Sequence, residues 1–283
     1  MSDPAQLSRF PVQCVQAASG AVQYRQSGQA AAVTHVLLHG IGSGSASWVA
    51  QLQAADGRSD CRLLAWEAPG YGDSAPVAPA SPVAIDYAQR LWAWLDALDV
   101  RKPVVLVGHS LGCLMAASAA VLQPARLQRL VLLSPARGYG DAPAAERSEK
   151  LQSRLTTLQR LGPEGMAQTR AGAMLSPSAT PQQIEAVRQT MSQVRAAGYT
   201  QAAHLLANGV LSHDLVQLQM PISVASGEAD TITPPAACQQ VAQQVGVAWQ
   251  NLGAVGHACP LQAGDGVNAL LGLGRTQAVE SSA

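Results

Sequence analysis

The stretch VVLVGHSLGCLMAASAAVL, residues 104–122, decides the fold predicted for this chain. Four apolar residues run directly into GHSLG (108–112), and an alanine-rich segment follows at once. An apolar run without alternation is typical of a strand buried on both faces, whereas the segment after it has the composition of a helix. The sequence therefore predicts a sharp strand-to-helix turn that carries Ser110.

Five further apolar runs of the same kind lie along the chain, and each ends in residues that favour turns. Helix-like stretches at 82–99, 111–122 and 234–245 alternate with them. Two shorter segments, 12–17 and 21–26, precede the runs and predict a hairpin. Because strands that alternate with helices build a sheet covered on both faces, we predict an α/β fold with a mostly parallel central sheet. The five runs are VTHVLLHG (33–40), CRLLAWEAPG (61–70), LQRLVLLSPA (127–136), PISVASGEAD (221–230) and VAWQNLGAVGH (247–257).

The alternation is interrupted once, between residues 137 and 219, where only helical segments appear. We therefore expect residues 1–136 and 220–283 to form one core domain, with 137–219 inserted between two strands as a helical cap. Apolar residues of the insertion form either its own core or the underside that faces a site. The candidates for that underside are Leu151, Leu155, Leu158, Met174, Met191 and Leu205.

Ser110 is a candidate nucleophile. In G-x-S-x-G between a strand and a helix, the glycines remove Cβ clashes from a strained turn, although an ordinary tight corner would also fit. A serine hydroxyl needs a general base and an orienting carboxylate, in the chain order Ser, Asp or Glu, His. Asp230 and His257 each follow a predicted strand and occupy these places, with Glu228 as a rival to Asp230. Thr233 is expected to cap the helix that begins after it.

The stretch HGIGSGSASW (39–48) follows another apolar strand and is glycine-rich. Glycines let a backbone approach a substrate closely, and backbone amides can stabilise an oxyanion. The amide of Ile41 is one candidate donor. The amide of Leu111, at the start of the helix after the serine, is the second.

Two alternative interpretations come from other classes of site. Gly40 and Gly42 after a strand, with Glu67 ending the next strand, partly imitate a dinucleotide-binding fingerprint, but position 45 is serine where the third glycine is needed. Cys113 could suggest a thiol nucleophile. It lies in a helix-like run without a histidine at useful spacing, which favours buried packing.

Together these motifs resemble those of the α/β-hydrolase superfamily, in its order and approximate spacing over nearly the whole chain. They are HGIGSGSASW, WEAPGYGDS, GHSLG, GEADTITPP and GHACPLQ. The segment GYTQAAHLLANGVLSHD also resembles the late part of the cap in hydrolases related to 3-oxoadipate enol-lactonases and carbon-carbon bond hydrolases of aromatic catabolism. The resemblance implies an α/β-hydrolase fold with a helical cap, and no metal or organic cofactor. It also implies Ser110 as nucleophile, His257 as general base and acid, Asp230 as its partner, and the Ile41 and Leu111 amides as oxyanion hole.

Some positions depart from the family pattern. Residue 67 is Glu where many relatives carry Asp, and we interpret Glu67 as a carboxylate that tethers a loop. Carbon-carbon bond hydrolases usually have glycine-proline-glycine after the HG pair, whereas this chain has Gly42-Ser43-Gly44. The serine in the turn argues against the dehalogenase branch, which uses aspartate there.

Composition limits the partners of the chain. Lys plus Arg and Asp plus Glu number 18 each, so no net field favours nucleic acid or an anionic membrane. The five cysteines are scattered and form no C-x-x-C pair, which is typical of reduced thiols in a cytoplasmic protein. The first residues lack the pattern of a signal peptide, and no run reaches the length of a membrane helix. A homo-oligomer is compatible with this composition.

The sequence thus predicts a serine hydrolase that cleaves a small carboxylic ester or lactone through an acyl-enzyme. A carbon-carbon bond hydrolase acting on a vinylogous ketone is the alternative reaction. A hydrolase-fold binding protein without turnover is the alternative from another class. The expected partner in every case is a small carbonyl compound.

Overall fold

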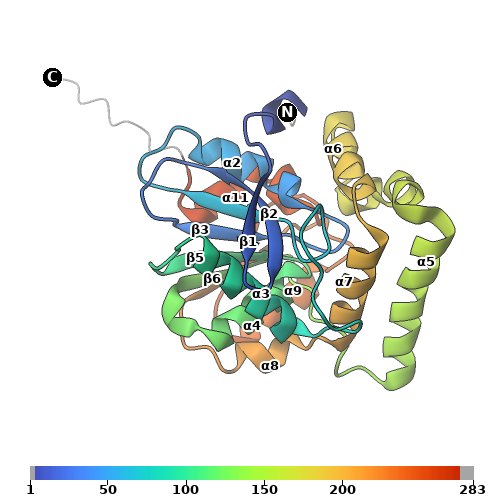
Figure 1. Cartoon of the computed structure of the whole chain (residues 1–283). Helices are drawn as coiled ribbons and strands as arrows, with labels where there is room; N and C mark the ends of the chain where they lie inside the picture. The colour runs from blue at the N-terminus through green and yellow to red at the C-terminus, as the bar shows by residue number, and fades with distance from the viewer. Residues whose placement is uncertain (1–3, 275–283) are drawn as a thin grey trace.

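An eight-stranded sheet forms the centre of the computed structural model, which describes residues 4–274 (Figure 1). Its strand order is β1-β2-β4-β3-β5-β6-β7-β8. The first three strands in that order pair antiparallel, and all pairs from β4 to β8 are parallel, which confirms a mostly parallel sheet. The strands are β1 (Gln13–Ala17), β2 (Gly20–Ser27), β3 (His35–Leu38), β4 (Leu63–Trp66), β5 (Val104–His109), β6 (Leu127–Leu133), β7 (Ile222–Ser226) and β8 (Trp249–Asn251).

Helices cover both faces of this sheet, as the uninterrupted apolar runs predict. Along β5, Leu106 packs into the same cluster as α3 and α4, whereas Val105 and Val107 pack into the cluster that holds α2 and α11. Successive residues of a strand point to opposite faces, and all three side chains are buried because helices cover both faces. The core helices are α2 (Val49–Ala55), α3 (Ala84–Ala97), α4 (Gly112–Leu122), α9 (Pro235–Gln244) and α11 (Gly264–Leu271).

The segment between β6 and β7 is helical throughout its regular structure. It contains α5 (Ala144–Arg170), η3 (Gly172–Met174), α6 (Pro181–Ser192), α7 (Ala196–Asn208) and α8 (Leu211–Leu215). Helix α5 breaks at Gly162, where φ is +62° and proline follows. Helices α5, α6 and α7 lie together at one side of the sheet, whereas α8 packs on α4 of the core (Figure 1). The segment is therefore not one uniform layer.

Two glycines show how closely α7 approaches the core. A Cβ atom on Gly198 of α7 would lie 2.1 Å from the carbonyl oxygen of Gly70, in the loop after β4. No side chain fits in that space, so the two backbones pack directly on each other. The remaining short elements are α1 (Pro4–Leu7), η1 (Ser45–Trp48), η2 (Pro124–Arg126) and α10 (Cys259–Gln262).

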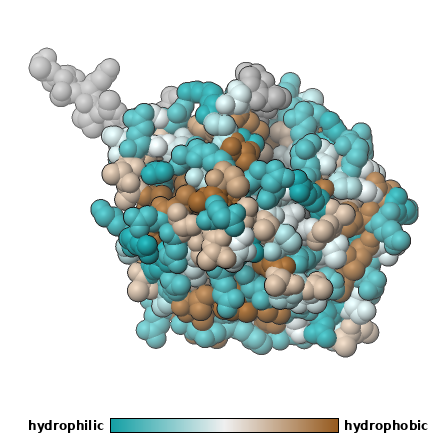
Figure 2. All heavy atoms as spheres, in the orientation of Figure 1, coloured by the Kyte–Doolittle hydropathy of each residue, from teal (hydrophilic) through white to brown (hydrophobic). Residues whose placement is uncertain are grey.

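Hydrophobic and hydrophilic side chains are interspersed over the face of the molecule in Figure 2. The larger apolar side chains that are exposed lie scattered along the chain, with only Val83 and Ile85 close together at the start of α3, and single exposed apolar residues are ordinary on protein surfaces. No helix within residues 4–274 combines the length and apolarity needed to span a bilayer. The exposed set is Val12, Val83, Ile85, Leu122, Ile184, Val216 and Ile232.

Candidate active site

Ser110 occupies the sharp turn predicted between β5 and α4. Its φ is +53°, a left-handed conformation that costs energy for a residue with a side chain. A Cβ atom on Gly108 would lie 2.6 Å from the Gly112 carbonyl oxygen, and one on Gly112 would lie 2.3 Å from the Leu38 carbonyl oxygen. The Ser110 amide donates to the Leu133 carbonyl at 2.9 Å, which fixes the turn to β6. Glycines on both sides therefore allow α4 to begin against the sheet with the serine at its start.

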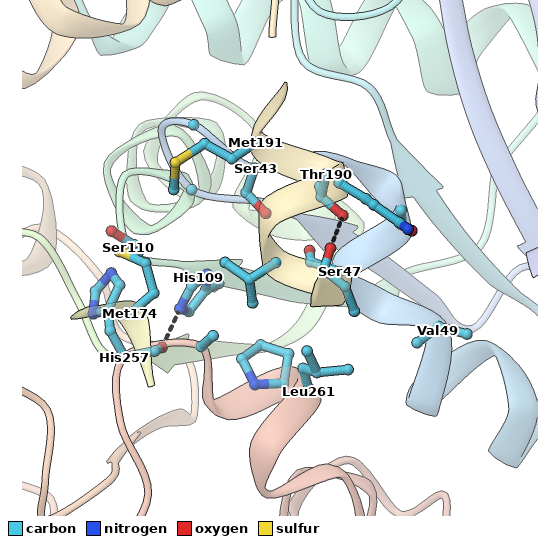
Figure 3. Close-up of a pocket in the computed structure, with 18 of the residues that line it drawn as sticks. Ser43, Ser47, Val49, His109, Ser110, Met174, Thr190, Met191, His257 and Leu261 are labelled. Carbon is cyan, nitrogen blue, oxygen red and sulfur yellow. Dashed lines mark hydrogen bonds between the residues drawn. The ribbon is translucent and has the colours of Figure 1, made fainter. Parts of the chain in front are cut away.

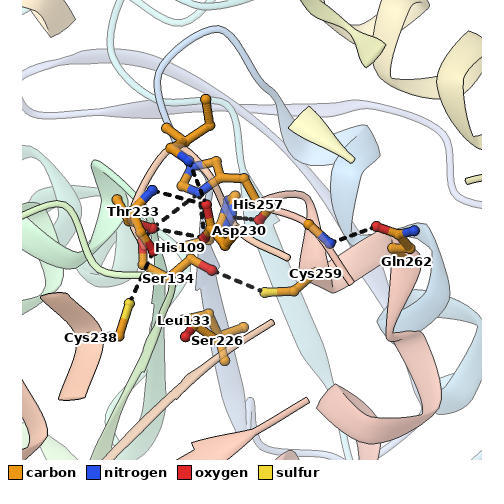
Figure 4. A network of polar contacts seen from close by, with 12 residues as sticks. His109, Leu133, Ser134, Ser226, Asp230, Thr233, Cys238, His257, Cys259 and Gln262 are labelled. Carbon is orange, nitrogen blue, oxygen red and sulfur yellow. Dashed lines mark hydrogen bonds and ion pairs between the residues drawn. The ribbon is translucent and has the colours of Figure 1, made fainter. Parts of the chain in front are cut away.

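Asp230 and His257 form a buried hydrogen-bonded pair (Figure 4). His257 Nδ1 lies 2.9 Å from Asp230 Oδ2, and these side chains are 2% and 0% exposed respectively. The amides of Ile232 and Thr233 donate to Asp230 Oδ1 at 2.9 Å each. Burial alone would raise the pKa of Asp230, but its contacts with His257 and with the Thr233 amide outweigh burial and lower it to about 2. Asp230 is therefore a carboxylate at neutral pH.

Thr233 is a site residue whose contacts the sequence did not reveal. Helix α9 begins at Pro235, and the Thr233 side chain makes no cap to it, so the expected cap is wrong. Instead Thr233 Oγ1 lies 2.8 Å from Asp230 Oδ2 and 3.2 Å from His257 Nδ1. It also lies within hydrogen-bond distance, 3.1 Å, of the Ser134 carbonyl oxygen. The side chain that was expected to start a helix thus packs against the acid–base pair.

Glu228 lies away from His257. Its side chain is exposed and accepts a hydrogen bond from Asn251 Nδ2. Of the two acidic residues that follow β7, the fold brings Asp230 to the imidazole. The loop after Ser226 instead directs Glu228 toward the edge of the sheet, where β8 ends at Asn251.

His109 is a second buried histidine beside the pair. Its Nε2 lies 2.8 Å from the His257 carbonyl oxygen, and the two imidazole centres are 5.0 Å apart. Burial, together with the nearby His257, lowers the pKa of His109 to about 3. The neutral ring therefore carries its proton on Nε2, and Nδ1 has no hydrogen-bond partner within residues 4–274. His109 was not among the site residues that the sequence identified.

Burial lowers the pKa values of three histidines, His35, His39 and His109, and this gives stability a defined pH dependence. Burial lowers the pKa of His35 to about 4 and that of His109 to about 3, below the ordinary value near 6.5 that the unfolded chain would have. Below about pH 6.5 the unfolded chain binds more protons, so the free energy of unfolding should fall by about 1.4 kcal/mol per pH unit for each histidine, down to about pH 4. Urea unfolding at about pH 7 and about pH 5 measures this loss, which we expect to be about 4 kcal/mol for His35 and His109 together, with His39 adding to it in the same direction.

The variant His35→Gln isolates the contribution of His35, because it removes one titrating ring and keeps a hydrogen-bonding side chain. Its loss between the same two pH values should be about 2 kcal/mol smaller than that of the original chain. An equal free energy of unfolding at both pH values would contradict the buried neutral state. Asp230 does not interfere, since its lowered pKa makes its contribution fall only below about pH 4.

Ser110 and His257 both line one cavity of about 350 Å³ (Figure 3). No hydrogen bond joins the two side chains, since among the described residues the His257 ring contacts Asp230 and Thr233. Catalytic hydrogen bonds are often long before substrate binds, so the lack of a Ser110–His257 hydrogen bond is compatible with a nucleophile and its base. In Figure 3 both side chains lie at one side of the cavity and Val49 lies at the other.

The helical insertion supplies another wall of this cavity. Met174 and Met191 line it, as expected for the underside of the insertion, together with α6 residues that include Thr190. The other four candidates do not line it. Leu158 and Leu205 belong to the hydrophobic core, and Leu151 and Leu155 are half-buried elsewhere. Their apolar side chains made these residues candidates, but only the tertiary fold decides which of them reach the cavity.

The amides of Ile41 and Leu111 lie on two segments that meet at the serine. A Cβ atom on Gly40 would lie 2.8 Å from Ser110 Cβ, so the loop after β3 passes directly beside the turn. Within residues 4–274 neither the Ile41 amide nor the Leu111 amide donates a hydrogen bond to a protein acceptor. Unpaired backbone donors at a cavity are available to a ligand oxygen.

Glu67 tethers the loop that follows Ile41. It accepts hydrogen bonds from the Ser45 amide, at 3.0 Å, and from the Ser45 hydroxyl. Its other oxygen lies 3.9 Å from His39 Nε2, which itself accepts the Ala68 amide at 3.0 Å. These contacts hold the loop against the end of β4, and they occupy the carboxylate that a dinucleotide site would need for a ribose.

Cys113 is buried in α4, with its sulfur 3.1 Å from the Gly108 carbonyl oxygen. Burial raises its pKa far above the ordinary value, which keeps it a thiol and argues against a thiolate nucleophile. The described residues contain no cluster of His, Cys, Asp and Glu suited to hold a metal ion.

The chain is similar to known hydrolases in both sequence and fold. The model of the alpha/beta hydrolase family matches residues 36–270. The chain is 24% identical to 3-oxoadipate enol-lactonase 2 of Acinetobacter baylyi over 80% of its own length and 82% of that protein. A 2-hydroxy-6-oxononadienedioate/2-hydroxy-6-oxononatrienedioate hydrolase of Cupriavidus pinatubonensis is 35% identical over 38% of each chain. The crystal structure of the enol-lactonase from Burkholderia xenovorans superposes with a TM-score of 0.80 at 18% identity, covering 92% of this chain and 99% of that one.

Proposed function

The chain belongs to the α/β-hydrolase family, and from that premise we propose that it is a serine hydrolase cleaving small carboxylic esters or lactones. One observation carries the proposal. A strained serine and a buried histidine–carboxylate pair lie together, with Ser110 and His257 lining the same cavity and Asp230 behind the histidine. The likeness to an enol-lactonase over most of both chains supports the same reaction class.

In the proposed first half-reaction, Ser110 Oγ attacks the carbonyl carbon of the substrate. Because Asp230 holds His257 through Nδ1, the imidazole can accept the hydroxyl proton on Nε2. The amides of Ile41 and Leu111 stabilise the negative oxygen that forms. His257 then gives the proton to the leaving oxygen as the ester bond breaks, and an acyl-serine remains.

In the second half-reaction, water attacks the acyl-serine. His257 takes a proton from the water and returns it to Ser110 Oγ, which releases the carboxylic acid. We infer that residues 137–219 act as a cap, with α6 and Met191 closing the cavity and limiting bulk water near the acyl group. Core residues 1–136 and 220–283 carry the remaining groups.

Carbon-carbon bond hydrolysis is the second candidate reaction. It is suggested by the relative named as a 2-hydroxy-6-oxononadienedioate/2-hydroxy-6-oxononatrienedioate hydrolase, which this chain matches over 38% of that protein's length. The Gly42-Ser43-Gly44 sequence in the oxyanion loop favours the ester or lactone reaction, because it differs from the glycine-proline-glycine turn of the carbon-carbon branch.

A panel of substrates tests the proposed function. It contains p-nitrophenyl esters of graded acyl length, an enol-lactone and a vinylogous ketone. We expect turnover of short esters and of the lactone, because a cavity of about 350 Å³ accommodates a small acyl group. Faster turnover of the vinylogous ketone would favour the second candidate. A folded protein that turns over none of them would instead indicate a binding protein.

A further inference from the structure

One charged side chain lies in the wall of the cavity that holds Ser110. Among the described lining residues, Arg25 is the only Asp, Glu, Lys or Arg. Arg25 comes from β2, far from Ser110 in sequence. Because β2 pairs with β4, Arg25 lies next to the loop after β3, which also lines the cavity. A cavity lined mainly by apolar and neutral polar groups therefore contains one fixed positive charge.

The guanidinium of Arg25 is only partly used by the protein. Nε donates to Ser45 Oγ at 3.1 Å and Nη1 donates to the Phe10 carbonyl, whereas Nη2 has no acceptor among residues 4–274. A guanidinium has five N–H donors, so most of those of Arg25 have no protein acceptor within the described part of the chain. The nearest acid, Glu67, shares Ser45 with Arg25 but makes no direct ion pair with it within the described residues.

Partial burial of the Arg25 guanidinium costs free energy unless an anion pairs with its unused N–H donors. Arg25 is half-buried, and burial lowers its pKa while Glu67 opposes that change. An arginine nevertheless stays cationic at neutral pH. Positive charge beside an apolar cavity is stabilised by an opposite charge that enters with the substrate, and a carboxylate matches the planar guanidinium with two hydrogen bonds.

Resting on the proposed hydrolase function, we propose that Arg25 binds a second, anionic group of the substrate. The preferred substrates are then esters or lactones that carry a free carboxylate away from the carbonyl attacked by Ser110. A purely structural arginine, which only ties Phe10 and Ser45 together, would give no such preference.

Matched pairs of substrates test this inference. Each pair consists of the p-nitrophenyl ester of a linear monocarboxylic acid and the p-nitrophenyl monoester of the dicarboxylic acid of the same chain length. The measured quantity is the ratio of kcat/KM for the anionic ester to that for the neutral ester, over a series of lengths. We expect the ratio to exceed one by about tenfold at the length that reaches Arg25, and to fall as salt is added.

Three variants identify the group responsible. Arg25→Gln should lower the ratio about tenfold, to near one, because it removes a charged hydrogen bond. Arg25→Lys should keep part of the preference, since it retains the charge without the planar pair of donors. Arg62→Gln is the matched control. It removes a nearby arginine that does not line this cavity, and it should leave the ratio unchanged.

The ratio compares two substrates on one protein, so partial loss of active protein in a variant cancels. A ratio near one at every length in the original chain would overturn the role of Arg25 and leave the hydrolase function standing. An unchanged ratio in Arg25→Gln would do the same. Absence of turnover on the neutral and anionic esters alike would instead refute the proposed function, and the Arg25 inference with it.

Discussion

Replacing Ser110 with alanine is expected to lower kcat on a p-nitrophenyl ester by about 10⁴- to 10⁶-fold. The change removes the only atom that can form the acyl-enzyme in the proposed reaction, while the oxyanion amides and the cavity remain. Alanine also tolerates the φ of +53° about as well as serine does, so the free energy of unfolding should change little. A fluorophosphonate probe gives the second measurement. One adduct is expected on the original chain, at Ser110, and none on Ser110→Ala.

Ser118→Ala is a suitable control for this experiment. Ser118 is a buried serine on α4, outside the cavity, and its replacement removes a hydroxyl from the same helix. It should keep both turnover and the adduct. An adduct that persists in Ser110→Ala would show that another residue reacts, and turnover that persists would refute the acyl-serine.

The sequence predicted the strands best where both faces of the sheet are covered. The strands β3 and β5 are buried at every position, and β6 is buried from Leu130 onward, because helices pack on each side. It predicted β8 least well, since only Trp249–Asn251 of the 247–257 run are in the sheet. The rest of that run is apolar because it returns over the core as the loop that carries His257, and burial of a loop has no periodicity to distinguish it from a strand.

The candidate site divides in the same way. Ser110, Asp230 and His257 were identifiable because strands of a parallel sheet end at one edge, so chain order translated into proximity. Arg25 and His109 were not, since their places depend on the pairing of β2 with β4 and on the depth of the turn at Ser110. In α6 only Met191 was among the sequence candidates, and the other α6 residues that line the cavity were not, because their places depend on how the insertion folds back.

Asp230→Asn is expected to lower kcat by about 10³- to 10⁴-fold. The carboxylate accepts from His257 Nδ1 at 2.9 Å and is oriented by the Ile232 and Thr233 amides, so the amide group of asparagine must turn a nitrogen toward some of these donors. With its NH₂ group toward His257, the imidazole would carry its proton on Nε2 and could no longer accept one from Ser110. Steady-state kinetics and the rate of fluorophosphonate labelling measure this loss.

Labelling separates this variant from Ser110→Ala, because Asp230→Asn keeps the serine and should still be labelled, only much more slowly. Glu228→Gln is the matched control, since it makes the same chemical change two residues earlier on a side chain that is exposed and bonded to Asn251. It should keep full turnover. If Glu228→Gln lost activity by orders of magnitude while Asp230→Asn kept it, Asp230 would not be the carboxylate that orients His257. The buried Asp230–His257 pair would then not be the acid–base pair that activates Ser110.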